Sequence, residues 1–176
     1  LIEEMCPEGV EYKNLGDVCS FERGSSLEKS ELRESGLPVV HYGEVHTRYG
    51  YKTPATYSFV EPEKAKKMRK AAPGDLVLVT TSENVEDVGK PLVWLGNQEL
   101  NVGGETYIIR SELDSLYLAH FFMSEDFKSQ SNRFISGTKV KRISSNSLSK
   151  IELGIPPLEI QKEIVKILDK FTELEA

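Results

Sequence analysis

One short segment near the C-terminus combines the side chains that can hold a phosphate group. Residues 137–142, GTKVKR, begin with a glycine and place three cations and a hydroxyl within six residues. Lysine and arginine attract phosphate oxygens, and a hydroxyl or an exposed backbone amide beside them can donate a hydrogen bond. A solvated, charged turn is the alternative interpretation. The candidate phosphate contacts are Thr138, Lys139, Lys141 and Arg142.

A second group of polar side chains occupies residues 46–51, HTRYGY. Arginine can read guanine through two parallel hydrogen bonds, and tyrosine or histidine can donate to a phosphate or stack on a base. A plain solvated connection between strands stays open as the alternative. The candidate contacts here are His46, Arg48 and Tyr49.

A third polar segment, residues 81–90, separates two apolar runs and is longer than a hairpin needs. Rigid strands that carry a polar loop are a common way to present recognition groups, although an ordinary connection fits the pattern too. Glu83, Glu86 and Asp87 would repel phosphates, so they must point away or accept from cytosine amino groups. The candidate contacts are Thr81, Ser82, Asn84 and Lys90.

The motifs of the common catalytic centres are missing from the sequence. There is no Gly-x-Gly-x-x-Gly, Walker A, His-Glu-x-x-His or Gly-x-Ser-x-Gly pattern. Residues 73–90 superficially resemble a nuclease motif, but Asp87 and Lys90 stand three residues apart, which does not fit it. The two cysteines lack zinc-site spacing, and His120 is expected to be a packed core residue. We therefore expect neither catalysis nor a metal site.

Charge is distributed unevenly along the 176 residues. The formal net charge is −6, but residues 1–19 carry −4 and residues 151–176 carry −3, which leaves +1 for the centre. A local basic surface can therefore exist on an acidic protein. The basic run between residues 64 and 70 is more typical of a solvated helix face, with Lys66 and Lys67 as further candidates for DNA contact. No apolar run is long enough to cross a bilayer, which predicts a soluble protein.

The polar segments need a framework, and the apolar pattern predicts one. The periodic stretch 115–135 predicts a helix pair with a new N-cap at Ser124. Residues 61–72 predict a helix that begins at Pro62, and residues 43–52 predict an exposed connection. Strands are expected at residues 18–21, 37–42, 76–80, 91–95 and 105–110.

The stretch after Pro156 predicts a helix that begins near Pro157 and carries a coiled-coil seam. Its apolar residues recur at steps of 4, 3, 4 and 3, the rhythm that lets one helix lie along another. The helix would be roughly 30 Å long, enough to separate two domains or to dock a partner. The expected partner-helix interface is Ile160, Ile164, Ile167, Phe171 and Leu174.

Several short motifs, taken in order, resemble those of one protein family. They are Leu15-Gly16-Asp17-Val18, Gly74-Asp75-Leu76-Val77, Val88-Gly89-Lys90, Ser136-Gly137-Thr138-Lys139 and the segment IPPLEIQKEI over residues 155–164. Together they resemble one target recognition domain and conserved helix of the DNA specificity subunit of type I restriction-modification systems. The last segment, with the Gly-Thr pair upstream of it, is the most specific part of this resemblance.

The resemblance implies a non-catalytic subunit that reads one half of a bipartite target for an adenine methyltransferase and endonuclease complex. It implies double-stranded DNA, methyltransferase subunits and, through the complex, a restriction and translocase subunit as partners. S-adenosylmethionine would be bound by the methyltransferase subunit, with no cofactor in this chain. The implied location is the cytoplasm of a bacterium or archaeon. Family members usually carry two recognition domains and this sequence has one, so it is expected to be a half-subunit that pairs with a second copy of itself, or part of a longer protein.

The expected fold is α+β, with a compact β-rich target recognition domain over residues 1–154, flanking helices, and a protruding C-terminal helix of coiled-coil type over residues 155–176. An alternative function is a protein-interaction module whose C-terminal helix is its only functional surface. A half-subunit that must dimerise before it binds DNA is a second alternative. A stand-alone nuclease or methyltransferase is disfavoured, because the motifs of both are missing.

Overall fold

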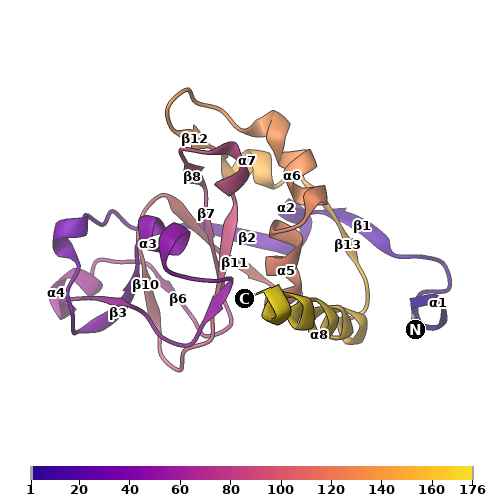
Figure 1. Ribbon diagram of the computed structural model, residues 1–176, viewed down its shortest axis with the longest axis horizontal. Coiled ribbons are helices and arrows are strands. Elements are labelled where there is room, and N and C mark those ends of the chain that lie inside the picture. The colour runs from indigo at the N-terminus through magenta and orange to yellow at the C-terminus, as the bar shows by residue number, and fades with distance from the viewer. Residues whose placement is uncertain (1, 176) are drawn as a thin grey trace.

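A five-stranded sheet lies in the middle of the molecule and is covered on both faces. The computed structural model describes residues 2–175 (Figure 1). Neighbouring strands of this sheet pair antiparallel, except that the short edge strand β4 pairs parallel with β9. In sheet order the strands are β2 (Cys19–Arg23), β11 (Thr106–Ser111), β7 (Leu76–Val79), β9 (Lys90–Trp94) and β4 (Lys52–Thr53).

Side chains of the central strands point alternately to the two faces of the sheet and so belong to two separate cores. In β7, Leu76 and Leu78 belong to one cluster of buried side chains, whereas Val77 and Val79 belong to the other. Successive residues of a strand point to opposite faces, so an uninterrupted apolar run indicates a strand that is covered on both sides. The expectation of a buried strand at residues 76–80 is confirmed.

Helices cover one face of the central sheet. α5 (Ser115–Phe122) and α6 (Glu125–Ser131) pack on each other, and Phe127 is wholly buried with its ring edge against Phe122. The Ser124 hydroxyl accepts a hydrogen bond from the Phe127 amide at 3.2 Å, and so it caps α6. The predicted helix pair and its internal N-cap are both confirmed.

A four-stranded sheet covers the other face, and one expected helix is largely replaced by it. The helix expected over residues 61–72 is only α4 (Pro62–Ala65). The Lys70 ammonium donates to the carbonyls of Ala65 and Met68 at 2.7 and 2.9 Å, which closes the helix end and lets the chain turn into a strand. In sheet order the strands are β5 (Ser58–Val60), β3 (Leu37–Val40), β10 (Leu100–Val102) and β6 (Lys70–Ala71).

The prediction of an exposed connection over residues 43–52 is wrong, because residues 43–47 belong to a helix. In α3 (Tyr42–Thr47), the His41 imidazole accepts from the Gly43 amide at 3.1 Å and caps the first turn. Val45 and Tyr49 are buried in the core between the two sheets. The sequence pattern hides this helix, since its cap is a histidine and Val45 alone marks its apolar face.

Two short ribbons, several short helical turns and the long helix α8 complete the chain. β1 (Glu11–Asn14) pairs antiparallel with β13 (Glu152–Ile155), and β8 (Thr81–Ser82) pairs antiparallel with β12 (Lys141–Arg142). The remaining elements are α1 (Ile2–Met5), α2 (Leu15–Val18), η1 (Lys29–Glu31), η2 (Val85–Asp87), η3 (Asn132–Phe134), α7 (Ser145–Leu148) and α8 (Leu158–Glu175).

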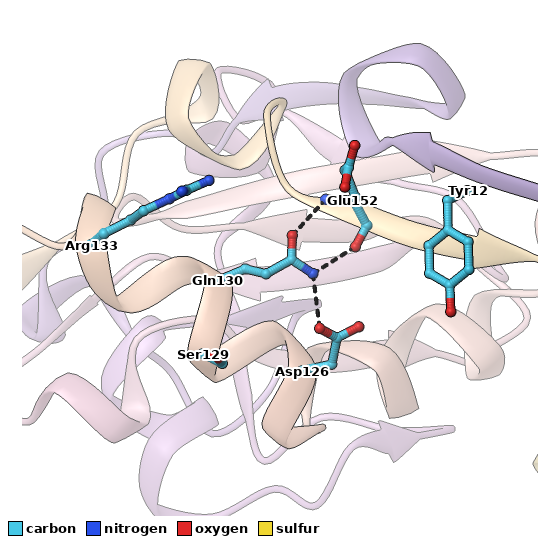
Figure 2. Close-up of a pocket in the computed structure, with 6 residues that line it drawn as sticks. All are labelled: Tyr12, Asp126, Ser129, Gln130, Arg133 and Glu152. Atoms are coloured by element: carbon cyan, nitrogen blue, oxygen red, sulfur yellow. Dashed lines mark hydrogen bonds between the residues drawn. The ribbon is translucent and has the colours of Figure 1, made fainter.

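One edge of β13 is capped by a side chain of α6 (Figure 2). The Gln130 amide accepts from the Glu152 backbone N–H at 2.9 Å and donates to the Glu152 carbonyl at 2.8 Å and to Asp126 at 3.0 Å. The side-chain amide thus imitates a neighbouring strand at an edge that would otherwise be open. The hollow of about 430 Å³ at this place, with Tyr12 on its wall, is the seam between α6 and the β1–β13 ribbon.

The expected α+β class, with a β-rich domain, flanking helices and a long C-terminal helix, is confirmed by this arrangement. α8 lies against the domain as far as Asp169, where its side chain bonds to Tyr51, Lys52 and His120. From Lys170 to Glu175, every residue of α8 is exposed. A domain boundary at residue 155 stays a prediction.

Candidate nucleic-acid interface

The three polar segments singled out in the sequence lie side by side in the folded chain. β12 pairs with β8, so Lys141 faces Ser82 across the ribbon. An imidazole nitrogen of His46, at the end of α3, hydrogen-bonds the Thr81 carbonyl at 2.9 Å. The Lys90 ammonium donates to the carbonyls of His46 and Tyr49 at 3.1 and 3.2 Å. Segments that are distant in sequence therefore form one continuous surface beside the β8–β12 ribbon, which is labelled in Figure 1.

Between α3 and β8 lies a groove of about 780 Å³. Its walls carry both signs of charge, with Lys29 and Arg48 near Glu44, Glu83 and Asp87. Base edges present both donors and acceptors, so a mixed lining suits base edges better than phosphates. The predicted contact residues that line this groove are His46, Arg48, Thr81, Ser82 and Asn84.

Arg48 is held in a defined orientation at the groove. One guanidinium nitrogen donates to Glu44 at 3.1 Å, and the guanidinium carbon lies 4.2 Å from the ring centre of Tyr57. Half of the Arg48 side chain, 50%, remains exposed. A planar guanidinium that is fixed on one side and open on the other is suited to forming paired hydrogen bonds with a base edge.

Glu44 organises the same wall and is missing from the sequence prediction. One carboxylate oxygen accepts from Arg48 and from the Ser58 hydroxyl at 2.8 Å, whereas the other is buried without a hydrogen-bond partner in residues 2–175. Burial lowers the pKa of neighbouring His41, so its imidazole is neutral at pH 7 and can accept from the Gly43 amide. Glu44 stands three residues after this cap, a usual place for a helix-capping acid, but that signal is readable only once α3 is known.

Three predicted contacts are instead engaged inside the domain. Tyr49 is 7% exposed, its hydroxyl accepts from the Tyr57 amide at 2.8 Å, and burial raises its pKa to about 12. The Lys90 ammonium is held by carbonyls, and burial lowers its pKa. Thr81 is 5% exposed and donates to Glu105. The expectation that these side chains project from exposed loops is corrected: they hold the loops in place.

The tip of the ribbon, residues 136–142, is a tight turn with a free cation. Gly137 has φ +108°, and a Cβ there would lie 1.9 Å from the Val140 carbonyl oxygen, so only glycine fits. The Lys141 ammonium donates to the carbonyls of Gly137 and Thr138 at 2.9 and 3.0 Å, which stiffens the turn. Lys139 is exposed and forms no ion pair or hydrogen bond within the described part of the chain. The tip therefore offers one unengaged ammonium on an ordered turn.

The apolar seam of α8 is divided between two surfaces. Ile160 is 1% exposed and Val165 is 7% exposed, so both face the domain, whereas Ile167 is 55%, Phe171 62% and Leu174 83% exposed. Ile164 lies between these groups, half-buried. The prediction that all five seam residues form one partner surface is therefore corrected at Ile160, which the chain's own domain already covers.

Polar contacts fix the inner face of α8 at two points. The buried Gln161 amide donates to the Pro156 carbonyl at 2.8 Å and accepts from the Asp114 amide at 2.9 Å. About two turns later, Asp169 accepts from Tyr51 and from Lys52 at 3.1 Å, and it bonds His120 at 2.8 Å. Burial alone would raise the pKa of Asp169, but these hydrogen bonds outweigh it and hold the pKa below its ordinary value.

This contact revises the expectation for His120 and links the helix to the recognition segments. His120 is partly buried, with 8% of its side chain exposed, and its ring bonds the α8 carboxylate rather than serving apolar packing alone. Tyr51 and Lys52 come shortly after Tyr49, whose carbonyl accepts from the same Lys90 ammonium as the carbonyl of the groove residue His46. The C-terminal helix is therefore joined to the wall of the groove through a short run of backbone. Neither Tyr51 nor Asp169 carries a sequence signal for this role.

Residues 2–175 contain neither a candidate metal centre nor a candidate membrane span. No group of three or more histidine, cysteine, aspartate or glutamate side chains is placed to hold a metal ion there. No helix in that range has the length and apolar character that crossing a membrane requires.

An α+β domain that gathers polar loops beside a groove and carries a long amphipathic helix has the form of a recognition module. The sequence profile of the family described as "Type I restriction modification DNA specificity domain" matches residues 7–176. The chain belongs to this family, and the resemblance inferred from its motifs is confirmed. The family description concerns the DNA specificity part of type I restriction-modification systems.

Individual relatives agree with this assignment and are much longer. The chain is 26% identical over 169 residues to the type I restriction enzyme EcoKI specificity subunit of Escherichia coli K12, which covers 93% of this chain and 36% of that protein. It is also 26% identical over 182 residues to the putative type I restriction enzyme MjaX specificity subunit of Methanocaldococcus jannaschii, with 96% and 40% covered. The chain thus spans well under half the length of these relatives.

Solved structures share the fold. The HsdS subunit from Thermoanaerobacter tengcongensis superposes with a TM-score of 0.65 at 21% identity, over 98% of this chain and 41% of that one. A chain from a study of complex assembly and conformational transition of the type I R-M system gives a TM-score of 0.66 at 22% identity, over 96% and 39%. At these identities the likeness concerns the fold alone, and it agrees with the α+β class described above.

Proposed function

We propose that this domain reads one half of a bipartite duplex DNA target, with the groove between α3 and β8 facing base edges and the β8–β12 ribbon lying against the backbone. The observation that carries this proposal is the convergence of three polar segments, distant in sequence, on one surface. The major groove of B-form DNA admits a two-stranded ribbon, and β8–β12 is a ribbon with cations at Lys139 and Arg142.

Within this proposal the side chains divide by task. Arg48, Ser82 and Asn84 are exposed or half-exposed at the groove and would contact base edges. Lys139 and Arg142 would contact phosphates, which fixes register without reading sequence. His46 positions the Thr81 strand through its carbonyl bond. Tyr49 and Lys90 hold the scaffold from inside.

The family assignment supports further partners. Methyltransferase subunits would dock on the domain and its helix and would bind S-adenosylmethionine, and a restriction and translocase subunit would join through the complex. The exposed stripe of Ile167, Phe171 and Leu174 would pack on another helix, either of a second recognition unit in a longer chain or of a second copy of this one. This stripe also favours the rival function, a protein-interaction module that contacts no DNA.

Sequence selection by the assembled complex separates these functions. The chain, bound to the methyltransferase subunits of its own system, is offered a pool of random duplexes, and bound duplexes are sequenced. A defined half-site should be enriched. Arg48→Ala should abolish preference at one position of that half-site, because a bidentate contact discriminates by about 1–3 kcal/mol.

Arg133→Ala is the matched control, because Arg133 also stacks on an aromatic ring, that of Phe134 at 4.7 Å, but lies outside the groove. It should leave the enriched half-site unchanged. Absence of any enrichment with the wild-type chain, while the complex still assembles, would favour the interaction module. Enrichment that survives Arg48→Ala, Ser82→Ala and Asn84→Ala unchanged would exclude the groove as the reading surface.

A further inference from the structure

A second hollow lies beside the β8–β12 ribbon. It has a volume of about 360 Å³ and adjoins the groove at Thr81, which lines both. Its lining differs in character, because it combines two arginines with several hydroxyls and has a single carboxylate. The side chains that matter here are Arg23, Ser136, Arg142, Ser147 and Glu105.

The donors of this hollow are largely unengaged. Neither the Arg23 guanidinium nor the Ser136 hydroxyl forms a hydrogen bond or ion pair in the described range. The Ser147 hydroxyl accepts from Ser144 at 3.1 Å and keeps its own proton for another acceptor. Arginine guanidinium groups beside free hydroxyls are a chemistry suited to a phosphate oxygen.

Glu105 supplies the negative charge in the lining of this hollow. Its carboxylate accepts from the Thr81 hydroxyl and lies 3.7 Å from Nε of Arg142, which is too long for a hydrogen bond. The Arg142 side chain is 61% exposed, so its other donors are open to a ligand. Glu105 therefore attracts Arg142 without saturating it.

The backbone of Glu105 adopts a conformation that residues other than glycine seldom take. Its φ of +60° makes it the one residue other than glycine with a positive φ among residues 2–175. Such a conformation persists only when surrounding contacts impose it, and it concentrates at ligand sites. Here the Glu105 carbonyl accepts from both the amide and the hydroxyl of Thr80, at 3.1 and 3.2 Å. These bonds aim the carboxylate into the hollow at the cost of an unfavourable backbone conformation.

We propose that this hollow binds one phosphate of the DNA backbone between Arg23 and Arg142, and that Glu105 occupies the place of this anion until DNA arrives. The inference rests on the proposed function, since it assumes that DNA lies along the ribbon. Glu105 is then a positioning residue. In the free chain it keeps Arg142 beside Thr81, and it lowers the affinity for duplexes whose phosphate cannot displace the Glu105 carboxylate from Arg142. Neither Arg23 nor Glu105 is indicated by the sequence pattern.

The test measures duplex affinity of the chain with its methyltransferase subunits at several salt concentrations. Arg23→Ala should lower affinity for all duplexes about three- to tenfold and reduce the slope of log affinity against log salt by about 0.9, while the enriched half-site stays the same. Glu105→Gln keeps a hydrogen-bond acceptor for Thr81 but removes the charge, so it should raise affinity for unrelated duplexes about two- to fivefold. Arg133→Ala serves again as the matched control and should change neither quantity.

The outcomes separate this inference from the proposed function. If the wild-type complex selects a half-site but Arg23→Ala leaves the salt slope unchanged, the phosphate pocket is wrong and the groove stands. Equal or lower affinity in Glu105→Gln, with its thermal unfolding unchanged, would exclude the role of a displaced anion. Inorganic phosphate, substituted for chloride at constant ionic strength, provides the last arm: thermal stabilisation that depends on Arg23, without any effect of Arg23→Ala on duplex binding, would mean that the hollow takes free phosphate instead of DNA.

Discussion

The inner face of α8 and the tip of the β8–β12 ribbon are built in opposite ways. α8 is held by buried apolar residues, by Gln161 and by the hydrogen bonds to Asp169. The tip, residues 136–142, is held by two backbone hydrogen bonds between Ser136 and Arg142 and by the Lys141 ammonium. One region is fixed by many buried contacts, whereas the other is an exposed turn held by a few hydrogen bonds.

This difference agrees with the proposed function, in which α8 packs on a second recognition unit and the ribbon tip contacts DNA. On the proposed function, α8 packs on the helix of a second recognition unit, so it should not shift relative to its own domain. A loop that meets a DNA backbone gains from limited freedom, since loops on a rigid scaffold commonly carry binding residues. Substitutions on the inner face of α8 should therefore change stability, and substitutions in the tip should change binding.

The largest effect is expected for a matched pair of isoleucines on α8. Ile160 is 1% exposed and Ile167, one heptad later, is 55% exposed. Ile160→Ala should lower the free energy of unfolding by about 2–4 kcal/mol, because it leaves a cavity in the core. Ile167→Ala should change it by less than about 0.5 kcal/mol. Urea titration followed by circular dichroism measures both, and equal effects of the two substitutions would show that the seam is not divided as described.

Asp169 provides the second test of the anchored region. Asp169→Asn puts an amide donor among Tyr51, Lys52 and His120, and should lower the free energy of unfolding at pH 7 by about 2 kcal/mol. The pKa of Asp169 is lowered in the folded chain, so its stabilisation is present above its ordinary value of 3.8 and is lost as pH falls through the folded value. The difference between wild type and variant should therefore shrink only below that ordinary value.

Asp126→Asn is the control for this comparison, because Asp126 is exposed and bonded only to Gln130. It should alter unfolding by less than about 0.5 kcal/mol. A loss in Asp169→Asn that is no larger than in this control would mean that the last turns of α8 are not anchored to the domain.

A pair of glycines tests the ribbon tip. At Gly137 a Cβ would meet the Val140 carbonyl, whereas at Gly74, which has φ +91°, no atom lies within 4 Å. Gly74→Ala should cost about 1 kcal/mol of stability through backbone strain alone and leave DNA affinity unchanged. Gly137→Ala should force the turn open and weaken duplex binding about tenfold, with little change in global unfolding, because the tip contributes few packed contacts. The reverse pattern would place the structural role at the tip.

Much of the framework is predictable from sequence, and the reason is visible in particular elements. The run Leu76–Val79 is apolar throughout because both faces of β7 are covered, and Ser124 caps α6 with the local chemistry that any helix start uses. By contrast, α3 begins at a histidine cap, and the helix expected over residues 61–72 yields to a strand because β10 supplies a partner from far along the chain. Local patterns predict local elements, while long-range pairing overrides them.

The candidate site shows the same limit. The three polar segments are recognisable by composition, but their contact depends on the His46–Thr81 bond and on the β8–β12 pairing, which no local pattern encodes. Burial then determines which of two neighbouring candidates can contact DNA: Arg48 is half-exposed, whereas Tyr49 is packed inside the domain. Glu44 and Glu105 act through partners that only the folded chain provides.

The smallest expected effect distinguishes two lysines of the tip. Lys139 is exposed and unengaged within residues 2–175, whereas the Lys141 ammonium binds the carbonyls of Gly137 and Thr138. If each neutralises one phosphate, either alanine substitution should lower the salt slope by about 0.9. Only Lys141→Ala should also speed hydrogen exchange of amides in residues 136–142, because it removes the bonds that order the turn. Lys128→Ala, on α6, is the control for both measurements. A slope unchanged in Lys139→Ala would remove this ammonium from the interface, and the binding role of the tip would then rest on its shape and on Arg142.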